Sequence, residues 1–273
     1  MVQPITVMTI AGSDSGGGAG IQADLRTFAA FGVHGTTALS AVTAQNTLGV
    51  QDVAVLPTSL VVSQVRCVVD DFDVAAVKTG MLGDADVVES VADLAREGLL
   101  ANLVVDPVLV STTQHSLMSD GGVRAYREAL VPLAQVVTPN LREAAALCGV
   151  DVRDVTTREH MDELAREILA LGPRFVLVKG GHFAAEGHDA PVADILRSAD
   201  DVVVFVADRV NTTNDHGTGC SLSAALGAGL ALGRSVPDAT RDAKSFVLAA
   251  LRGASGWRLG AGRGPLDHLG WTK

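Results

Sequence analysis

Cys220 is a lone thiol that directly follows the glycine-rich run 216–219 and opens an apolar, helix-like segment. Backbone N–H groups at a helix N-terminus attract anions, and glycines let the anion approach the backbone closely. The same position favours a thiolate at Cys220. Gly217, Thr218 and Gly219 therefore predict a site for a phosphoryl group in transfer, with Cys220 as a proton acceptor. The alternative for Cys220 is a small side chain that only packs.

Three charged residues stand where apolar runs end: Asp106, Glu143 and Lys179. Carboxylates hold Mg²⁺ sparingly, often through water, so Asp106 and Glu143 are candidates to organise this ion. Lys179 precedes two glycines and offers a compact positive charge for a nucleotide phosphate. Other interpretations stay open, because Glu143 also completes a capping box begun by Asn140, and Lys179 could be a surface residue in a turn.

A second group of residues could bind a small organic substrate. A long glycine-rich loop begins at Gly12 and fits neither a Walker A loop nor a dinucleotide-binding pattern. Asp24, in the following helix, could bond a ligand or face water. Gln45 carries an amide that suits the edge of a heterocycle, although a solvated turn would also use it. Met81 could line an apolar pocket or fill a gap in the core.

These motifs must be positioned by regular elements, and the chain alternates β-rich apolar runs with helix-period segments. The predicted strands are 5–12, 36–43, 74–80, 102–108, 135–140 and 174–181. The helical patterns are 19–31, 58–71, 84–97, 121–130, 141–148, 158–171, 219–232 and 236–254. A hairpin is expected near 192–206, and the tail after the last helix is expected to be loop.

This alternation indicates an α/β fold with a doubly wound, mostly parallel central sheet and helices on both faces. We found no repeat, linker or domain boundary, so residues 1–273 are expected to form a single domain. In such sheets ligands bind beyond the carboxyl ends of the strands. Polar, glycine-rich motifs follow almost every predicted strand, which places the candidate site at that edge.

Composition excludes several function classes. The formal net charge is −10, so no broad basic face for nucleic acid is expected. Cys67, Cys148 and Cys220 lie far apart, without metal-ligand spacing, which suits a reducing cytosol. The N-terminus has no basic signal region, and the longest apolar run is too short to span a bilayer. We therefore expect a cytoplasmic protein that does not bind membranes.

Seven motifs in order resemble the hydroxymethylpyrimidine and phosphomethylpyrimidine kinases of thiamin biosynthesis, which have the ribokinase-like fold. They are "AGSDSGGGAGIQADLRTF", "AQNTLGV", "KTGML", "DPV", "TPNLREAAAL", "VKGGH" and "NDHGTGCSLSAAL". The resemblance runs from about residue 5 to residue 250. It implies ATP-dependent phosphorylation of 4-amino-5-hydroxymethyl-2-methylpyrimidine, then of its monophosphate, with Mg²⁺. It also suggests a homodimer.

The resemblance assigns roles to individual residues. It places Asp24 and Gln45 on the aminopyrimidine, and Gly12, Met81 and Val108 around it. It makes Gly217–Cys220 the anion hole, with Cys220 where most ribokinase-like enzymes have an aspartate. It also gives Asp106 and Glu143 to Mg²⁺, and Lys179, Thr218 and Lys244 to the nucleotide.

Two segments depart from the family pattern. The loop after "DPVLV" reads "STTQHSL" instead of a Lys- or Ser-Gly type sequence, and Asp215 replaces a common Thr before "HGTGC". An extra carboxylate beside an anion site is unfavourable unless it faces solvent or is paired. Two other functions stay open: a pyridoxine or pyridoxal kinase of the same fold, and a pyrimidine or nucleotide sensor without catalysis.

Overall fold

The computed structural model describes residues 3–109, 120–181 and 191–271 of the chain. Their strands form one sheet in the order β3-β2-β1-β4-β5-β6-β7-β8-β9. The strands are β1 (Thr6–Asp14), β2 (His34–Asn46), β3 (Gly49–Val55), β4 (Val74–Thr79), β5 (Val104–Val105), β6 (Val136–Val137), β7 (Phe175–Val178), β8 (Val192–Arg197) and β9 (Val202–Ala207). All pairs from β2 to β7 are parallel, so their carboxyl ends share one edge.

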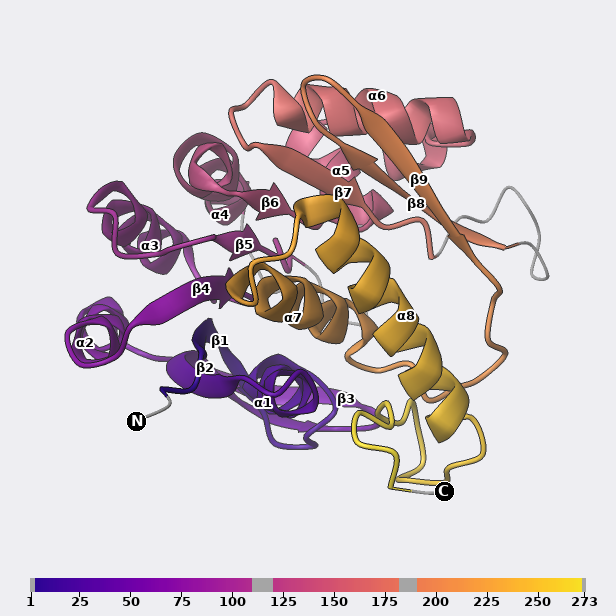
Figure 1. The fold of residues 1–273 in the computed structure, drawn as a ribbon, viewed down its shortest axis with the longest axis horizontal. Helices are drawn as coiled ribbons and strands as arrows, with labels where there is room; N and C mark the ends of the chain where they lie inside the picture. The colour runs from indigo at the N-terminus through magenta and orange to yellow at the C-terminus, as the bar shows by residue number, and fades with distance from the viewer. Residues whose placement is uncertain (1–2, 110–119, 182–190, 272–273) are drawn as a thin grey trace.

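The sheet is covered on both faces (Figure 1). One face packs against α2 (Thr58–Val69), α3 (Ala85–Arg96), α4 (Asp120–Ala125), α5 (Leu141–Cys148) and α6 (Arg158–Leu169). The other face packs against α1 (Gly20–Ala30), α7 (Thr218–Ala231) and α8 (Val236–Ala254). Because side chains alternate along a strand, neighbouring residues pack into the hydrophobic cores on opposite faces of the sheet, as Ala76 and Val77 of β4 do. The predicted doubly wound fold is confirmed.

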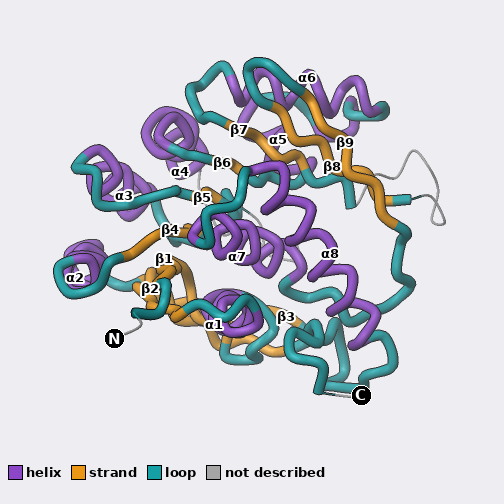
Figure 2. Tube along the Cα trace, viewed as in Figure 1, coloured by secondary structure: helices purple, strands orange, loops and turns teal. Residues whose placement is uncertain are grey.

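Most predicted elements appear at or near their expected positions. The hairpin forms between the antiparallel strands β8 and β9. Strand β3 was missing from the prediction: it pairs antiparallel with β2 at the sheet edge, and its exposed residues carry no buried pattern. The predicted strands at 102–108 and 135–140 shrink to two residues each, β5 and β6, with loop on either side (Figure 2).

Helix ends differ in a way that bears on function. Asp84, Asn140, Thr157 and Ser235 cap their helices with a side-chain oxygen, as is usual. Helix α7 has no side-chain cap, as is also true of α1 and α2, and its N-cap is Gly217, in the left-handed conformation with φ of 88°. No side chain therefore bonds the first N–H groups of α7.

The tail after α8 is loop, as expected, but it is closely attached to the fold (Figure 2). The N–H of His216 donates to the carbonyl of Gly264 (3.0 Å), and the N–H of Arg263 donates to the carbonyl of Thr47 (2.9 Å). This C-terminal strap, residues 255–271, ties the β2–β3 turn to the segment before α7. No helix in the described part of the chain is both long and apolar enough to span a membrane.

Candidate active site

The first turn of α7 forms the centre of the candidate site. A Cβ atom on Gly217 would lie 1.9 Å from the carbonyl oxygen of Gly18, so only glycine fits there. The side chain of Thr218 turns back and donates to the carbonyl of Asp215 (2.6 Å). The helical ladder begins with Ser221, whose N–H donates to Gly217 (2.9 Å). The N–H groups of Gly219 and Cys220 precede that ladder, as an anion hole requires.

Asp106 lies at the carboxyl end of β5 and gathers donors from three elements. Its Oδ1 accepts from the ammonium of Lys179 (2.8 Å) and the hydroxyl of Thr138 (3.1 Å). Its Oδ2 accepts from Ser223 on α7 (3.1 Å). A Cβ on Gly219 would meet Nζ of Lys179 at 3.3 Å, so this lysine lies directly against the anion hole. The structure thus brings Asp106, Lys179 and the N-terminus of α7 together.

Glu143 is buried beside this cluster and also caps α5. The predicted capping box with Asn140 is present: the N–H of Asn140 donates to Oε2 of Glu143 (2.7 Å), and the N–H of Glu143 donates back to Asn140 (3.0 Å). Burial raises the pKa of Glu143 to about 7; Lys179 opposes this shift and Asp106 adds to it. A carboxylate that is destabilised by burial and by a second carboxylate is a group that a divalent cation would stabilise.

The glycine-rich loop that follows Gly12 binds an anion of its own chain. The N–H groups of Gly16, Gly18 and Ala19 all donate to the carboxylate of Asp14, at 2.8, 3.0 and 2.8 Å. Burial would raise the pKa of Asp14, but the hydrogen bonds from His216, Ala19 and Gly16 outweigh burial and lower it. These N–H groups are therefore occupied by Asp14.

His216 connects this loop to Gln45. Nε2 of His216 lies 2.9 Å from Oδ2 of Asp14 and 3.1 Å from the Gln45 amide. Because Asp14 is ionised, the ring nitrogen carries the proton and donates to it, so it cannot also accept from an amide N–H. The consistent orientation turns the Gln45 carbonyl toward His216 and its NH₂ toward Thr43, whose hydroxyl donates to Ser13 (2.9 Å). The amide of Gln45 is thus held by neighbours on both sides.

The structure also places Gly12, Met81 and Val108, the other residues expected around a substrate. Gly12 and Met81 are in contact, since a Cβ on Gly12 would lie 2.5 Å from the terminal methyl of Met81. Val108 is half-buried, and its N–H donates to the carbonyl of Asp106 (2.9 Å). The "STTQHSL" loop, 111–117, lies outside the described residues.

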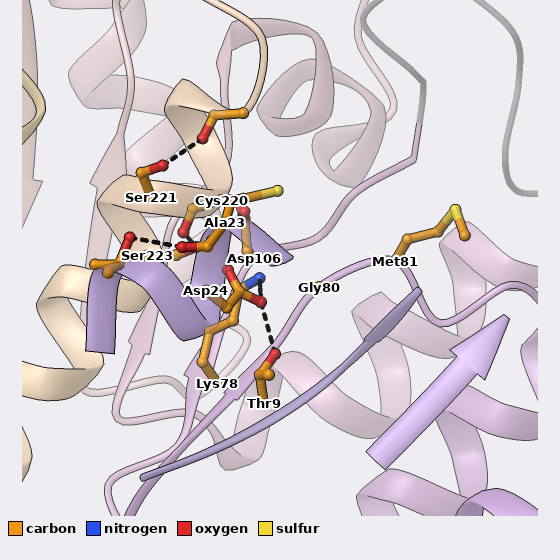
Figure 3. Close-up of polar contacts among 12 residues, drawn as sticks. Thr9, Ala23, Asp24, Lys78, Gly80, Met81, Asp106, Cys220, Ser221 and Ser223 are labelled. Carbon is orange, nitrogen blue, oxygen red and sulfur yellow. Dashed lines mark hydrogen bonds and ion pairs between the residues drawn. The ribbon is translucent and has the colours of Figure 1, made fainter. Parts of the chain in front are cut away.

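Asp24 is placed differently from an exposed ligand-binding carboxylate. It is fully buried, and its Oδ2 accepts from Nζ of Lys78 (2.9 Å) and from Thr9 (2.7 Å). Figure 3 shows Asp24, Lys78, Asp106 and Cys220 grouped together, with Met81 off to one side. Of the two interpretations given above, water contact is excluded and contact with a ligand stays a prediction.

Cys220 is half-buried at the start of α7. Burial raises the pKa of its thiol to about 11, and Asp24 and Asp106 add to the increase, whereas Lys78 and a hydrogen bond from the backbone of Gly20 lower it. The thiol is therefore neutral near pH 7 in the absence of ligands. A role as proton acceptor requires positive charge close to its sulfur.

Two further charged residues have partners. Lys244 on α8 pairs with Asp194 (2.5 Å), whose other oxygen accepts from the N–H of Gly180 (2.8 Å), next to Lys179. Asp215, the residue that departs from the family pattern, is bonded by both guanidinium arms of Arg263 from the strap. The unfavourable carboxylate beside the anion hole is thus neutralised.

Residues 14–267 match the family model of phosphomethylpyrimidine kinase. The chain belongs to this family. It is 48% identical to a hydroxymethylpyrimidine/phosphomethylpyrimidine kinase of Streptomyces coelicolor, over 99% of this chain and 96% of that protein. Among solved structures, the pyridoxal kinase of Bacillus subtilis in complex with ADP is similar with a TM-score of 0.87 and 38% identity, covering 97% of this chain and 98% of that one. Phosphomethylpyrimidine kinase from Clostridium difficile is similar with a TM-score of 0.79 and 36% identity, covering 90% and 99%.

Sequence reasoning missed the supporting residues His216 and Asp14, and it assigned no role to Lys78. Lys78 had a usable signal, because a lysine in an otherwise apolar strand must find a buried acidic partner. The pairing of His216 with Asp14 had none, since the two residues are 202 positions apart and either could have faced water.

Proposed function

We propose that this protein uses ATP to phosphorylate 4-amino-5-hydroxymethyl-2-methylpyrimidine and then the monophosphate, in thiamin biosynthesis. Family membership and the names of relatives support the substrate. The observation that carries the chemistry is the arrangement of Lys179, Cys220 and the uncapped N-terminus of α7 at one sheet edge. That arrangement suits phosphoryl transfer, where catalysis is mostly positioning and charge stabilisation.

The proposed roles follow from the contacts. The N–H groups of Gly219 and Cys220, together with Lys179, stabilise negative charge on the transferred group. The hydroxymethyl oxygen forms a bond to the γ-phosphorus as the bond to ADP breaks. Its proton passes to the sulfur of Cys220, which must first lose its own proton to act as the acceptor. Gln45, with its amide fixed by His216 and Thr43, reads the pyrimidine edge. Gly12, Met81 and Val108 shape the surrounding pocket.

Asp106 and Glu143 are the residues proposed to organise Mg²⁺. Among the described residues no group of three or more His, Cys, Asp or Glu side chains could hold a metal by itself. Two carboxylates fit an ion that is bound mainly through nucleotide phosphates, which is how proteins usually hold Mg²⁺. When bound, the ion would neutralise charge on the phosphates. Lys244 reaches this region only through Asp194 and Gly180, which supports an indirect contribution to nucleotide binding.

A pyridoxal kinase activity is the second candidate, because the similarity to the Bacillus subtilis enzyme extends over nearly the whole chain. Both substrates present a hydroxymethyl group on an aromatic nitrogen heterocycle. A ring that carries an amino group suits Gln45 better, because an amide offers both a donor and an acceptor to the edge of such a heterocycle.

The deciding experiment detects products by mass after incubation with ATP, Mg²⁺ and one substrate at a time. We expect mono- and diphosphate from hydroxymethylpyrimidine, and less phosphate ester from pyridoxal. Lys179→Met is the matched inactive control. Binding without any phosphorylated product would support the sensor and contradict our proposal, whereas phosphorylation of pyridoxal alone would support the second candidate.

We also propose that the protein is a homodimer in a reducing cytoplasm. The three cysteines Cys67, Cys148 and Cys220 are all free thiols, which supports a reducing compartment. Light scattering coupled to size exclusion would give the subunit number directly.

A further inference from the structure

The C-terminal strap contacts the chain on both sides of Gly217, the N-cap of α7. Before Gly217, the N–H of His216 donates to the carbonyl of Gly264 in the strap (3.0 Å). After it, the hydroxyl of Ser221 lies 2.7 Å from Nε2 of His268, which also belongs to the strap. The first contact joins two backbone groups, which every residue except proline can supply, whereas the second depends on one particular side chain. His268 is therefore the strap residue whose chemistry can be tested.

The hydroxyl of Ser221 connects this ring to the anion hole. It donates to the carbonyl of Gly217 (2.8 Å), which also accepts from the N–H of Ser221 (2.9 Å). A carbonyl can only accept and a hydroxyl has a single proton, so Nε2 of His268 carries the ring proton and donates to the hydroxyl. The hydrogen bonds thus run in one direction, from the ring through the hydroxyl to the carbonyl of Gly217.

Both side chains of this link are enclosed by the fold. Ser221 is 0% exposed and His268 is 4% exposed. Burial lowers the pKa of His268 to about 4, and the positive charge of Arg26 adds to this shift, so the ring is neutral near pH 7. Because water is kept out, it does not compete with the ring for the hydroxyl of Ser221. The link is therefore a permanent part of the folded protein at neutral pH.

The peptide group that follows Gly217 orients the anion hole. Glycine is the residue with the most backbone freedom, so a glycine N-cap can flip its peptide group unless neighbours hold it. The carbonyl of Gly217 points into the first turn of α7, and the N–H of Thr218, in the same peptide group, points back to the carbonyl of Asp215 (3.3 Å). A flip would turn the first turn of the helix and misdirect the N–H groups of Gly219 and Cys220. Holding one carbonyl thus holds the anion hole.

We propose that His268 is a positioning residue for phosphoryl transfer: through the hydroxyl of Ser221, its ring holds the carbonyl of Gly217 and keeps the N–H groups of the anion hole aimed at the transferred group. This role rests on the proposed function and deepens it. It requires no contact of His268 with a substrate and no proton transfer at the ring. Because the anion hole acts on charge that develops during transfer, its loss lowers kcat more than it weakens ATP binding.

The first test compares His268→Leu with His268→Gln in initial-rate kinetics. Leucine fills much of the space of the ring without an N–H, whereas the glutamine amide can place an N–H near the position of Nε2. In His268→Leu we expect kcat to fall about 10–100-fold, less than the 10²–10³-fold typical of losing a donor outright. KM for ATP should change less than about threefold, and His268→Gln should recover most of kcat. Normal turnover in His268→Leu, or equal losses in the two variants, would overturn the proposal.

Ser221→Ala breaks the same link from its other end and adds no bulk, so it keeps the test decisive if His268→Leu does not fold. We expect a similar loss of kcat, and the double variant with His268→Leu should be no slower than the slower single variant. Losses that multiply in the double variant, or normal turnover in Ser221→Ala, would contradict the proposal. Ser63→Ala is the matched control: Ser63 in α2 also donates to the carbonyl four residues back (2.8 Å to Ser59), but it is exposed, and kcat should not change.

Amide exchange followed by NMR tests the link without any substrate. The N–H of Ser221, which donates to Gly217, should exchange at least tenfold faster in His268→Leu than in the parent or in His268→Gln, while amides of α3 and α6 keep their rates. Equally faster exchange throughout the protein would indicate a general loss of stability and would contradict a positioning role. If no phosphorylated pyrimidine formed but Ser221 showed this local change, the proposed function would fail and the link would stand. If phosphorylation occurred and exchange at Ser221 were unchanged, only the link would fail.

Discussion

Two glycine-rich segments precede helices in this chain, and they behave differently. The first segment, residues 12–20, leads into α1; the second segment, residues 214–219, leads into α7. In the first, three N–H groups close around the carboxylate of Asp14. In the second, Gly217 leaves the helix uncapped, and Asp215 is drawn away by Arg263. Each segment contains one aspartate, and where that carboxylate points decides whether the backbone can bind a ligand.

The two segments are also pressed against each other. The Cβ that Gly217 lacks would meet Gly18, and the one that Gly18 lacks would lie 2.4 Å from the ring of His216. We call the first segment closed, because its N–H groups are occupied by Asp14, and the second segment open. The closed segment supports the open one: Asp14 orders the first loop, and that loop fixes the backbone and the histidine beside the anion hole.

Removal of the thiol from the open segment should have the largest effect. Cys220→Ala should lower kcat by about 10³-fold, within the usual range for loss of a useful general base. ATP binding, measured by calorimetry, should survive, because the backbone N–H groups remain. Cys67→Ala, on the exposed face of α2, is the matched control. Near-normal turnover in Cys220→Ala would remove the cysteine from the mechanism.

A methyl group placed between the two segments should cause the second-largest loss of activity. Gly217→Ala forces a Cβ to 1.9 Å from Gly18 at a φ of 88°, so the first turn of α7 must move. We expect kcat to fall about 10²–10³-fold, as when one donor to a developing anion is lost, and ATP affinity to fall as well. Gly233→Ala, after the other end of α7, has a φ of 78° and open space, so it imposes strain without collision. Equal effects of both variants would contradict the assignment.

How far the sequence could predict this site follows from the same comparison. Periodicity and strand-end motifs indicated the sheet, its eight helices and the anion hole before α7, because each depends on local pattern. The closed state of the first segment was not predictable, because a glycine-rich loop that binds a ligand and one that binds its own Asp14 have the same sequence pattern. The burial of Asp24 depends on Lys78, 54 residues away, and the edge strand β3 has too little buried surface to leave a pattern.

Weakening the closed segment should affect stability and substrate binding more than chemistry. Asp14→Asn leaves three N–H groups and His216 without their charged acceptor. We expect a loss of about 1.5–3 kcal/mol of unfolding free energy at pH 7, typical of hydrogen bonds to a charged group. KM for the pyrimidine should rise about tenfold through the loosened Gln45, equivalent to about 1.4 kcal/mol. Urea unfolding and initial-rate kinetics measure the two effects.

The stability effect has a defined pH dependence. The pKa of Asp14 is lowered below its ordinary 3.8 in the folded protein. Its ionised form therefore stabilises the fold above that pH, and the contribution disappears as pH falls through the folded pKa. The difference between Asp14→Asn and the parent should be full at pH 7 and shrink below pH 4. An equal difference at pH 7 and pH 3, or an equal loss in the exposed control Asp73→Asn, would contradict the role of the charge.

The smallest effect is expected where the open segment meets the strap. Arg263→Ala leaves the Asp215 carboxylate unpaired near the anion hole. Because both side chains are partly exposed, solvent screens the repulsion, and exposed pairs of this kind contribute about 0–1 kcal/mol. We expect KM for ATP to rise about threefold at low salt and less at high salt, in initial-rate measurements.

The double variant Arg263→Ala with Asp215→Asn shows why KM for ATP rises in Arg263→Ala. If the unpaired charge raises KM, removal of the carboxylate restores it. If Arg263 acts by holding the strap, whose Gly264 carbonyl accepts from His216, neutralising Asp215 restores nothing. Rescue would mean that the second segment is open because its own aspartate is neutralised from the far end of the chain. The carboxylate of Asp14 is instead bonded by the ring of His216 and by N–H groups of its own segment, and so the first segment closes on it.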